Sequence, residues 1–129
     1  MKIKIDAADR IFSQYIRLRD MQCMRCNSPV QLNAEGLPIS HQASHYFSRG
    51  REGTRFDPEN VDTLCMGCHK LWGGDEREFY TAFKIKQLGA HKFKLLTLHA
   101  HTYQKKDRKL MRIKAERLLA EIQQAKGLL

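Results

Sequence analysis

The sequence predicts a small α+β domain that a bound metal ion helps to hold together, and three features support this class. All four cysteines lie in two Cys-x-x-Cys pairs, and thirty-eight residues separate the first pair from the second. That intervening segment contains two short strand-like stretches joined by a glycine-containing loop. Apolar residues at helical spacing precede the first pair and follow the second. A chain of 129 residues builds only a modest core, so a structural metal would add stability that the core cannot supply.

The cysteine pairs predict one structural zinc ion bound by four thiolates. Each pair places two sulfurs close enough to share a tetrahedral ion. Two disulfides in a secreted domain are the alternative, but the stretch from Met1 to Ile5 lacks the apolar run of a signal peptide. A thioredoxin-like redox motif would need a βαβ pattern, which neither pair has. The long insert suits a treble-clef knuckle, in which a hairpin lies between the two pairs. The predicted zinc ligands are Cys23, Cys26, Cys65 and Cys68.

The segment between the cysteine pairs is predicted to form a β-hairpin that leads into a helix. Residues 38–47 form the first strand, with His45 near its end, and residues 61–64 form the returning strand. If Cys65 lies in the first turn of the helix, His69 follows on the same face one turn later. The hairpin would then hold the two histidines opposite each other. The connecting loop is basic because it contains Arg49, Arg51 and Arg55.

Three residues of this segment carry a resemblance to a known family. Fourteen residues separate His45 from Asn60, eight separate Asn60 from His69, and the two cysteine pairs bracket the series. This arrangement resembles the HNH, or ββα-metal, endonucleases, which have a treble-clef core. The wider string SHYFSRG…TRFDPENVDTLCMGCH resembles the phage NinG (Rap-type) recombination nucleases, which act on branched DNA. The similarity covers about residues 7–90.

The resemblance implies a role for each matched residue. His45 corresponds to the general base that takes a proton from the attacking water, and Asn60 to the residue that fixes the base imidazole. His69 corresponds to a ligand of a single catalytic divalent metal. A neutral imidazole, whose ordinary pKa is about 6.5, can accept a proton at neutral pH. A divalent ion would polarise the scissile phosphate and neutralise charge on the leaving oxygen.

The sequence departs from the HNH pattern at two positions. Ser44 stands where many HNH enzymes have an Asp or His as a second metal ligand, and Gly73 stands where some have a further His. His41 could substitute, although a regular strand would place it roughly 13 Å from His45. His41 and Ser44 are therefore the remaining candidates for additional metal ligands. A site made of one imidazole, waters and DNA oxygens favours Mg²⁺ or Mn²⁺ over tightly bound zinc.

A single domain is predicted over residues 1–129, with a short strand at residues 2–5 and a helix over residues 7–19 capped by Asp6. Its three parts are residues 1–22, the N-terminal strand and helix; residues 23–73, the zinc knuckle and ββα core; and residues 74–129, a basic helical extension.

Three helices are predicted in the C-terminal extension. Asp75 and Glu78 have the spacing of a capping box for a helix that ends at Leu88, and a second helix covers residues 90–100. The last helix, over residues 103–126, is amphipathic. The residues of the first helix expected to face inward are Phe79, Phe83 and Ile85. The apolar stripe of the last helix consists of Met111, Ala115, Leu118, Ile122 and Ala125.

Positive charge is concentrated toward the C-terminus. The net charge is +9, yet residues 1–83 contain eleven basic and eleven acidic residues, whereas residues 84–129 contain twelve and three. Beside a phosphodiesterase site such a surplus favours contact with a nucleic-acid backbone, and a merely solvated helix face is the alternative. The apolar stripe of the last helix could also pair two subunits. The predicted DNA contacts are Arg49, Arg51, Arg55, Lys105, Arg108, Lys109 and Arg112.

Three functions fit these patterns. The first is a metal-dependent HNH-type DNA endonuclease of phage or prophage recombination, with structural zinc and catalytic Mg²⁺ or Mn²⁺. The second is a zinc-stabilised DNA-binding module that has lost cleavage, and the third is a protein-interaction adaptor. The complete set of His45, Asn60 and His69 argues against an adaptor, which has no need of it. No run approaches eighteen apolar residues, so no membrane span is predicted and a cytoplasmic location is expected.

Overall fold

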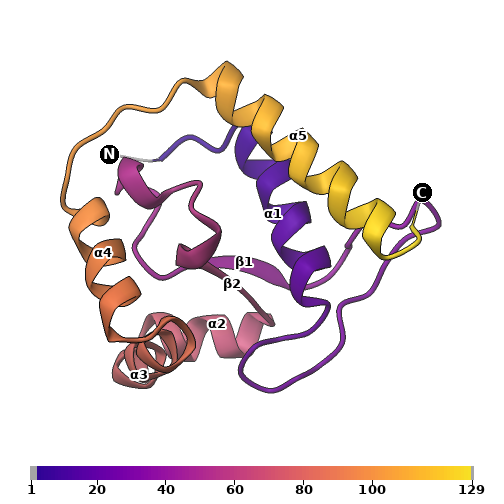
Figure 1. Cartoon of the computed structure of the whole chain (residues 1–129). Helices are drawn as coiled ribbons and strands as arrows, with labels where there is room; N and C mark the ends of the chain where they lie inside the picture. Colours follow the sequence, from indigo (N-terminus) through magenta and orange to yellow (C-terminus); the bar gives the residue numbers. More distant parts are fainter. Residues whose placement is uncertain (1–2, 129) are drawn as a thin grey trace.

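The computed structural model describes residues 3–128. Within that range five α-helices surround a two-stranded antiparallel hairpin, whose loop contains two short 3-10 helices (Figure 1). The predicted α+β class is confirmed. In chain order the elements are α1 (Ala7–Asp20), β1 (Gln42–His45), η1 (Glu52–Thr54), η2 (Pro58–Asn60), β2 (Val61–Leu64), α2 (Met66–Gly73), α3 (Arg77–Leu88), α4 (Ala90–Ala100) and α5 (Arg108–Ala125).

Helix α1 begins where the sequence predicts because Asp6 and Asp9 form a reciprocal capping box. The Asp6 carboxylate accepts the Asp9 backbone N–H at 3.1 Å, and the Asp9 carboxylate accepts the Asp6 backbone N–H at 3.0 Å. The helix ends at Asp20, because Met21 adopts a left-handed conformation with φ of 59°. The cap at Asp6 is therefore confirmed.

The hairpin is shorter than predicted in its first strand and agrees with the prediction in its second. Strand β1 begins only at Gln42, because His41 has a left-handed φ of 66° that interrupts the extended chain. Strand β2 has the predicted bounds. The strands pair with His45 opposite Val61 and Gln42 opposite Leu64. Neighbouring side chains of β1 point to opposite faces of the hairpin, which decides below which of them reach the site.

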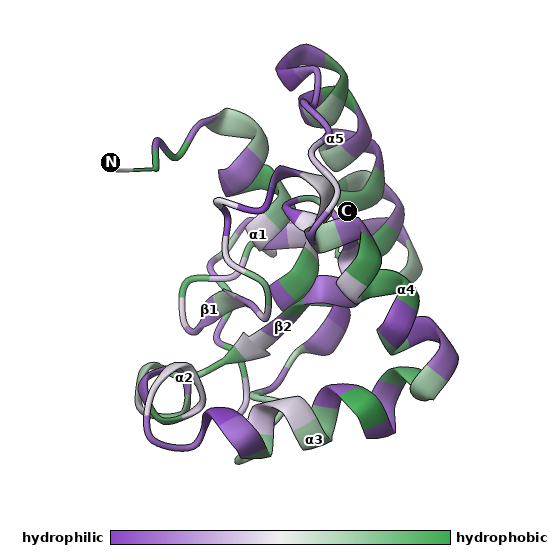
Figure 2. Ribbon diagram, turned by 90° about the vertical axis from the view of Figure 1, so that its left-hand side faces the viewer, coloured by the Kyte–Doolittle hydropathy of each residue, from purple (hydrophilic) through white to green (hydrophobic). Residues whose placement is uncertain are grey.

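Helix α1 lies between the hairpin and α5, and the three elements share one hydrophobic core (Figure 1). Figure 2 shows polar and apolar residues alternating along α5, as expected for a helix with one buried side. Met111 and Ala115 of the predicted stripe are buried, and Leu118 packs against the same core. The first three residues of this stripe therefore pack within the single chain, and the pairing of two subunits through α5 stays a prediction. The core residues are Phe12, Ile16, Ala43, Val61 and Ala115.

A second core lies beneath α2 and α3 and encloses a buried ion pair. The rings of Trp72 and Tyr80 stack with centroids 4.8 Å apart. Lys84 Nζ donates to Asp62 Oδ2 at 3.1 Å, and neither side chain has exposed surface. The Tyr80 hydroxyl and the Gln87 amide donate to the same carboxylate at 3.2 and 3.0 Å. These bonds fasten α3 to β2 and satisfy the buried charges.

Helix α3 consequently presents a different face from the one predicted. Phe79 and Ile85 are 56% and 41% exposed, and of the three predicted residues only Phe83 packs inward. A buried lysine has no apolar signature in the sequence, so the periodicity pointed to the wrong side of the helix. The inward residues include Tyr80 and Lys84.

Several predicted boundaries also need correction. The capping box of Asp75 and Glu78 is wrong, because α3 begins at Arg77 and its N-cap makes no side-chain hydrogen bond. Helix α4 agrees with the prediction. Helix α5 begins five residues later than predicted, where the Asp107 carboxylate accepts the Leu110 backbone N–H at 3.1 Å. Residues 3–5 form no strand, and residue 2 lies outside the described range. None of the described helices has the length and apolarity that a membrane crossing requires.

Candidate active site

Four cysteine sulfurs come together where the first Cys-x-x-Cys loop meets the start of α2. They all lie within 4.8 Å of one another, and the Sγ atoms of Cys26 and Cys65 are 3.8 Å apart. Sulfurs bound at about 2.3 Å to a tetrahedral zinc ion lie roughly 3.8 Å from each other, so the donors and their spacing suit zinc. The fold thus brings together the predicted ligands Cys23, Cys26, Cys65 and Cys68.

Hydrogen bonds around the sulfurs tie this cluster to the rest of the fold. Arg25 Nη1 donates to Cys68 Sγ at 3.3 Å, and the same guanidinium donates to Glu76 at 3.0 Å. On the other side of the cluster, Cys26 Sγ lies 3.3 Å from the hydroxyl of Ser28. Such outer contacts orient metal ligands and lower the cost of holding several thiolates together. The cluster therefore links the knuckle, α2 and the segment that precedes α3.

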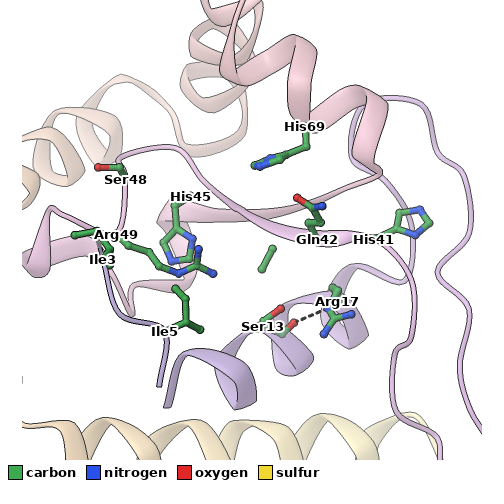
Figure 3. Close-up of a pocket in the computed structure, with 11 residues that line it drawn as sticks. Ile3, Ile5, Ser13, Arg17, His41, Gln42, His45, Ser48, Arg49 and His69 are labelled. Atoms are coloured by element: carbon green, nitrogen blue, oxygen red, sulfur yellow. Dashed lines mark hydrogen bonds between the residues drawn. The ribbon is translucent and has the colours of Figure 1, made fainter. Parts of the chain in front are cut away.

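The predicted histidines meet in a pocket of about 570 Å³ between the hairpin, α1 and α2 (Figure 3). His45 enters it from β1 and His69 from α2, as the sequence predicts. Arg49 of the hairpin loop points into the same space. Among residues 3–128 no carboxylate lines this pocket. The lining residues are Ile3, Ile5, Ser13, Arg17, His41, Gln42, Ala43, His45, Ser48, Arg49 and His69.

The loop of the hairpin holds His45 in one tautomer. His45 Nε2 lies 2.9 Å from the carbonyl oxygen of Arg55. A carbonyl oxygen only accepts, so Nε2 carries the proton and Nδ1 keeps its lone pair. Nδ1 is buried and has no hydrogen-bond partner within the described part of the chain. Burial, followed by the positive charge of Arg49, lowers the pKa of His45 to about 4. The ring is therefore neutral at pH 7, with an unpartnered basic nitrogen.

His69 has a matching environment. Its Nδ1 is also buried and unpartnered within residues 3–128. Burial and then the charge of Arg49 lower the pKa of His69, so this ring too favours the neutral form that binds metal ions. Arg49 thus acts electrostatically on both imidazoles. Its Nε is 3.8 Å from Asp9 Oδ1.

Asn60 holds the hairpin loop beside the site in place through its side-chain amide. Its side-chain oxygen accepts the Phe47 backbone N–H at 2.8 Å, and its amide donates to the carbonyls of Phe47 and Thr54 at 2.9 and 3.0 Å. The residue has no exposed surface, and its side chain makes no hydrogen bond to His45 among the described residues. Asn60 therefore positions His45 indirectly, because it fixes the loop whose Arg55 carbonyl holds the ring.

The end of α4 braces the same loop from outside. A Cβ atom on Gly53 would collide with the backbone carbonyl of His99, so only glycine allows η1 to approach α4 this closely. The loop that carries the Arg55 carbonyl is therefore fixed on both sides, by Asn60 and by α4.

Neither of the two additional metal-ligand candidates presents a free donor atom to the pocket. His41 lines the rim of the pocket, but its Nε2 lies 3.0 Å from the Ser28 hydroxyl and its Nδ1 lies 2.8 Å from the Ser40 hydroxyl. Both ring nitrogens are thus engaged. Ser44 lies on the face of β1 opposite to His45, where its hydroxyl accepts from Tyr80 at 3.4 Å. His69 is therefore the one predicted catalytic-metal ligand that keeps a free nitrogen within the described range.

A comparison with known protein families agrees with the site described above. The family model described as bacteriophage lambda NinG protein matches residues 2–127 of the chain. The chain belongs to the NinG family. The match includes the knuckle, the hairpin and the helical extension, so the predicted resemblance to NinG proteins is confirmed at the level of the family. No curated protein and no solved structure matches the chain.

Two arginines predicted to bind DNA are structural in this NinG-family protein. Arg55 is only 4% exposed, and its guanidinium donates to both carboxylate oxygens of Asp9 at 2.9 and 2.6 Å. Arg108 pairs with Glu52 at 3.0 Å and with Asp6 at 3.6 Å. Arg55 is thus occupied by a buried carboxylate, and Arg108 is held by two carboxylates although its side chain remains partly exposed. The sequence does not reveal these ion pairs, because the partners lie far away along the chain.

The other predicted DNA contacts reach solvent. Arg51 is exposed in the hairpin loop, and Lys105 precedes α5 instead of lying on it. Lys109 is exposed on α5, and Arg112 is exposed but pairs with Glu116 at 2.9 Å. Exposed pairs of this kind are weak, so Arg112 can exchange its partner for a phosphate at little cost.

The site also contains residues that no motif of the sequence assigned to it. Ser13 and Arg17 of α1, and Ile3 and Ile5 of the N-terminal segment, line the pocket together with the two histidines. They lie far from the His45–His69 segment in sequence and belong to no recognisable motif. The contact of α1 with the hairpin, which brings them there, depends on tertiary packing alone.

Asp9 gives a test of the ion pair that supports the loop. Burial raises its pKa, but hydrogen bonds from Arg55 and from the Asp6 backbone outweigh this effect and lower it from 3.8 to about 2. The resulting stabilisation, about 2 kcal/mol, is complete above roughly pH 4 and is lost as the pH falls toward 2. Asp9→Asn should remove this pH-dependent component. It should also cost up to about 3–5 kcal/mol at pH 7, because it leaves the buried Arg55 charge with only its longer contact to Glu52, at 3.6 Å.

Urea unfolding of wild type and Asp9→Asn between pH 2 and pH 7 would measure both effects. Asp75→Asn, at an exposed carboxylate, is the matched control and should change little. Equal stability of Asp9→Asn and wild type at pH 7 would contradict the structural role of the pair.

Proposed function

We propose that this NinG-family protein is a metal-dependent DNA endonuclease of the HNH type, which hydrolyses phosphodiester bonds in recombination intermediates. The observation that carries the proposal is the pocket itself. There His45 and His69 each present a neutral imidazole with an unpartnered Nδ1, beside the guanidinium of Arg49. The order of zinc knuckle, hairpin and helix supports the treble-clef, ββα-metal arrangement of that family.

His45 suits the role of general base. Its Nδ1 has a free lone pair and can take a proton from a water molecule that attacks the phosphate. The Arg55 carbonyl bound to Nε2 would stabilise the imidazolium that forms. The pKa of about 4 applies to His45 when no substrate is bound in the pocket. A bound phosphate would offset the charge of Arg49, and this would raise the pKa of His45 and make it a stronger base.

His69 is the residue that would hold a catalytic divalent cation, through a ring nitrogen. Because the described lining offers no carboxylate, the other ligands would be water and phosphate oxygens, which suits Mg²⁺ or Mn²⁺. Such an ion supplies positive charge that stabilises the leaving oxygen. Arg49 contributes a second positive charge at the same place, and its neighbour Asp9 does not cancel it, because Asp9 is bound by Arg55.

DNA is the proposed partner, recognised mainly through its backbone. Arg49 would contact the phosphate in the pocket, and exposed Arg51 one close to it. Lys105, Lys109 and Arg112 remain proposed contacts to flanking DNA, since all three are exposed. Arg55 and Arg108 are left out of this set because both are held in ion pairs.

A DNA-binding module without cleavage is the second candidate. One observation favours it: Ser44 faces away from the pocket and Gly73 has no side chain, so with His45 acting as the base, His69 is the one imidazole that the described residues leave for a catalytic metal. A site that depends this strongly on substrate oxygens would bind metal weakly.

Cleavage assays on linear duplex, single-stranded and branched DNA separate these candidates. The nuclease proposal expects cleavage that requires Mg²⁺ or Mn²⁺ and stops when a chelator removes the ion. Binding to DNA without cleavage of any of the three substrates, in protein that retains its zinc, would favour the binding module.

A further inference from the structure

A groove runs along the exposed side of α1 and opens into the pocket of the two histidines. The pocket of about 570 Å³ and a neighbouring hollow of about 260 Å³ share part of their lining. The shared residues are Ile5, Ser13, Arg17 and Arg49, and the second hollow adds Arg10 and Gln14 on its far side. The two hollows therefore form one continuous depression.

One face of α1 supplies the polar side of this groove. Arg10, Ser13, Gln14 and Arg17 follow one another at i, i+3, i+4 and i+7, so they lie on a single side of the helix. Seven residues of α-helix extend about 10 Å, which is the length that about three successive phosphates of one strand occupy along duplex DNA. All four side chains can donate hydrogen bonds to phosphate oxygens.

The groove has a net positive charge, because Arg10, Arg17 and Arg49 outnumber its acidic lining residue. Its one acidic lining residue is Asp9, whose two carboxylate oxygens are taken by Arg55. Arg17 donates to the carbonyls of Ser13 and Ser40, which leave its charge in place. Arg10 is exposed and forms no salt bridge within residues 3–128. An anionic chain is thus the complementary occupant.

We infer that this groove carries the backbone of one DNA strand to and from the catalytic pocket, with Arg10, Gln14 and Arg17 as its phosphate contacts. The inference rests on the proposed function and adds the path of the strand. The charge surplus in the C-terminal residues had pointed to α5 instead. Helix α5, however, lies on the side of α1 away from the pocket (Figures 1 and 3), so its lysines and arginines cannot line this groove.

A short single-stranded oligonucleotide that covers only the site tests the path. Binding is measured by fluorescence anisotropy at several salt concentrations, without divalent cations, in the inactive His45→Ala background. The groove variant is Arg10→Gln with Gln14→Glu. The matched control, Arg117→Gln with Gln124→Glu, makes the same charge change on exposed residues of α5 that are not among the proposed DNA contacts. Circular dichroism on both variants confirms that the fold is retained.

The groove variant should bind more weakly, and its slope of log K against log salt should be shallower by about 0.7 for each lost contact with single-stranded DNA. The α5 control should bind like the parent protein. An unchanged slope in the groove variant, or an equal loss in the control, overturns the inference. Cleavage by wild type with an unaffected groove variant would refute only the path, whereas a weakened groove variant in a protein that never cleaves would refute only the nuclease.

Discussion

Replacing His45 with alanine should reduce the rate of DNA cleavage by about 10² to 10⁴ at saturating DNA, the range typical for loss of a general base. The substitution removes the Nδ1 lone pair from the pocket and leaves the cysteines, the hairpin pairing and Arg49 in place. DNA affinity and thermal stability should therefore stay close to those of wild type. Single-turnover cleavage, measured beside melting curves and DNA titrations, checks all three expectations.

Two further histidine variants test whether the loss of cleavage is specific to the histidines of the pocket. His69→Ala should also abolish cleavage, but with a changed metal requirement, because it removes the proposed protein ligand of the ion. His91→Ala, on the exposed side of α4, is the matched control and should cleave like wild type. If His45→Ala cut DNA as fast as wild type, another group would have to be the base.

Disrupting the four-cysteine cluster should prevent zinc binding and unfold the protein. Cys65→Ser or Cys68→Ser removes one of four sulfurs that lie within 4.8 Å of each other. Structural zinc contributes about 10–16 kcal/mol of apparent binding free energy in zinc-finger peptides, whereas a whole domain is stable by only about 5–15 kcal/mol. The free energy of zinc binding is therefore about as large as the free energy of unfolding of the whole domain.

The measurement is circular dichroism together with the zinc content of freshly reduced protein. Wild type should contain about one zinc ion per chain and lose its cooperative melting when a strong chelator is added. Met66→Ser places the same serine on the exposed neighbour of Cys65 and should leave both properties intact. A cooperatively folded wild-type protein without zinc would contradict the structural role of the cysteines.

Local signals explain the parts of the structure that the sequence predicted correctly. The Asp6 cap lies next to the helix it starts, and each cysteine pair is a local motif. His45 and His69 lie in strand and helix segments whose order already implies that they meet. In each case the information lies within one element or two consecutive ones.

Long-range electrostatics explain most of the errors. Arg55 lies in the predicted basic loop, but it is buried in an ion pair with Asp9, 46 positions earlier in the chain. Lys84 has no apolar signature in the sequence, but its ion pair with Asp62, which Tyr80 also contacts, places it in the core, so α3 packs through a face other than the predicted one. Such pairs follow no periodicity, because a buried charge depends on the one partner that the fold places beside it.

The proposed chemistry depends most directly on which ring nitrogen of His45 carries the proton and on the pH at which the ring becomes charged. Nitrogen-15 NMR of the histidine rings, with the His45 signals assigned by comparison with His45→Ala, measures both in the folded protein. The structure predicts a protonated Nε2, an unprotonated Nδ1 and a ring that stays neutral until the pH falls to about 4. A proton on Nδ1 at pH 7, or titration at the ordinary value near 6.5, would show that His45 does not present a free base to the pocket.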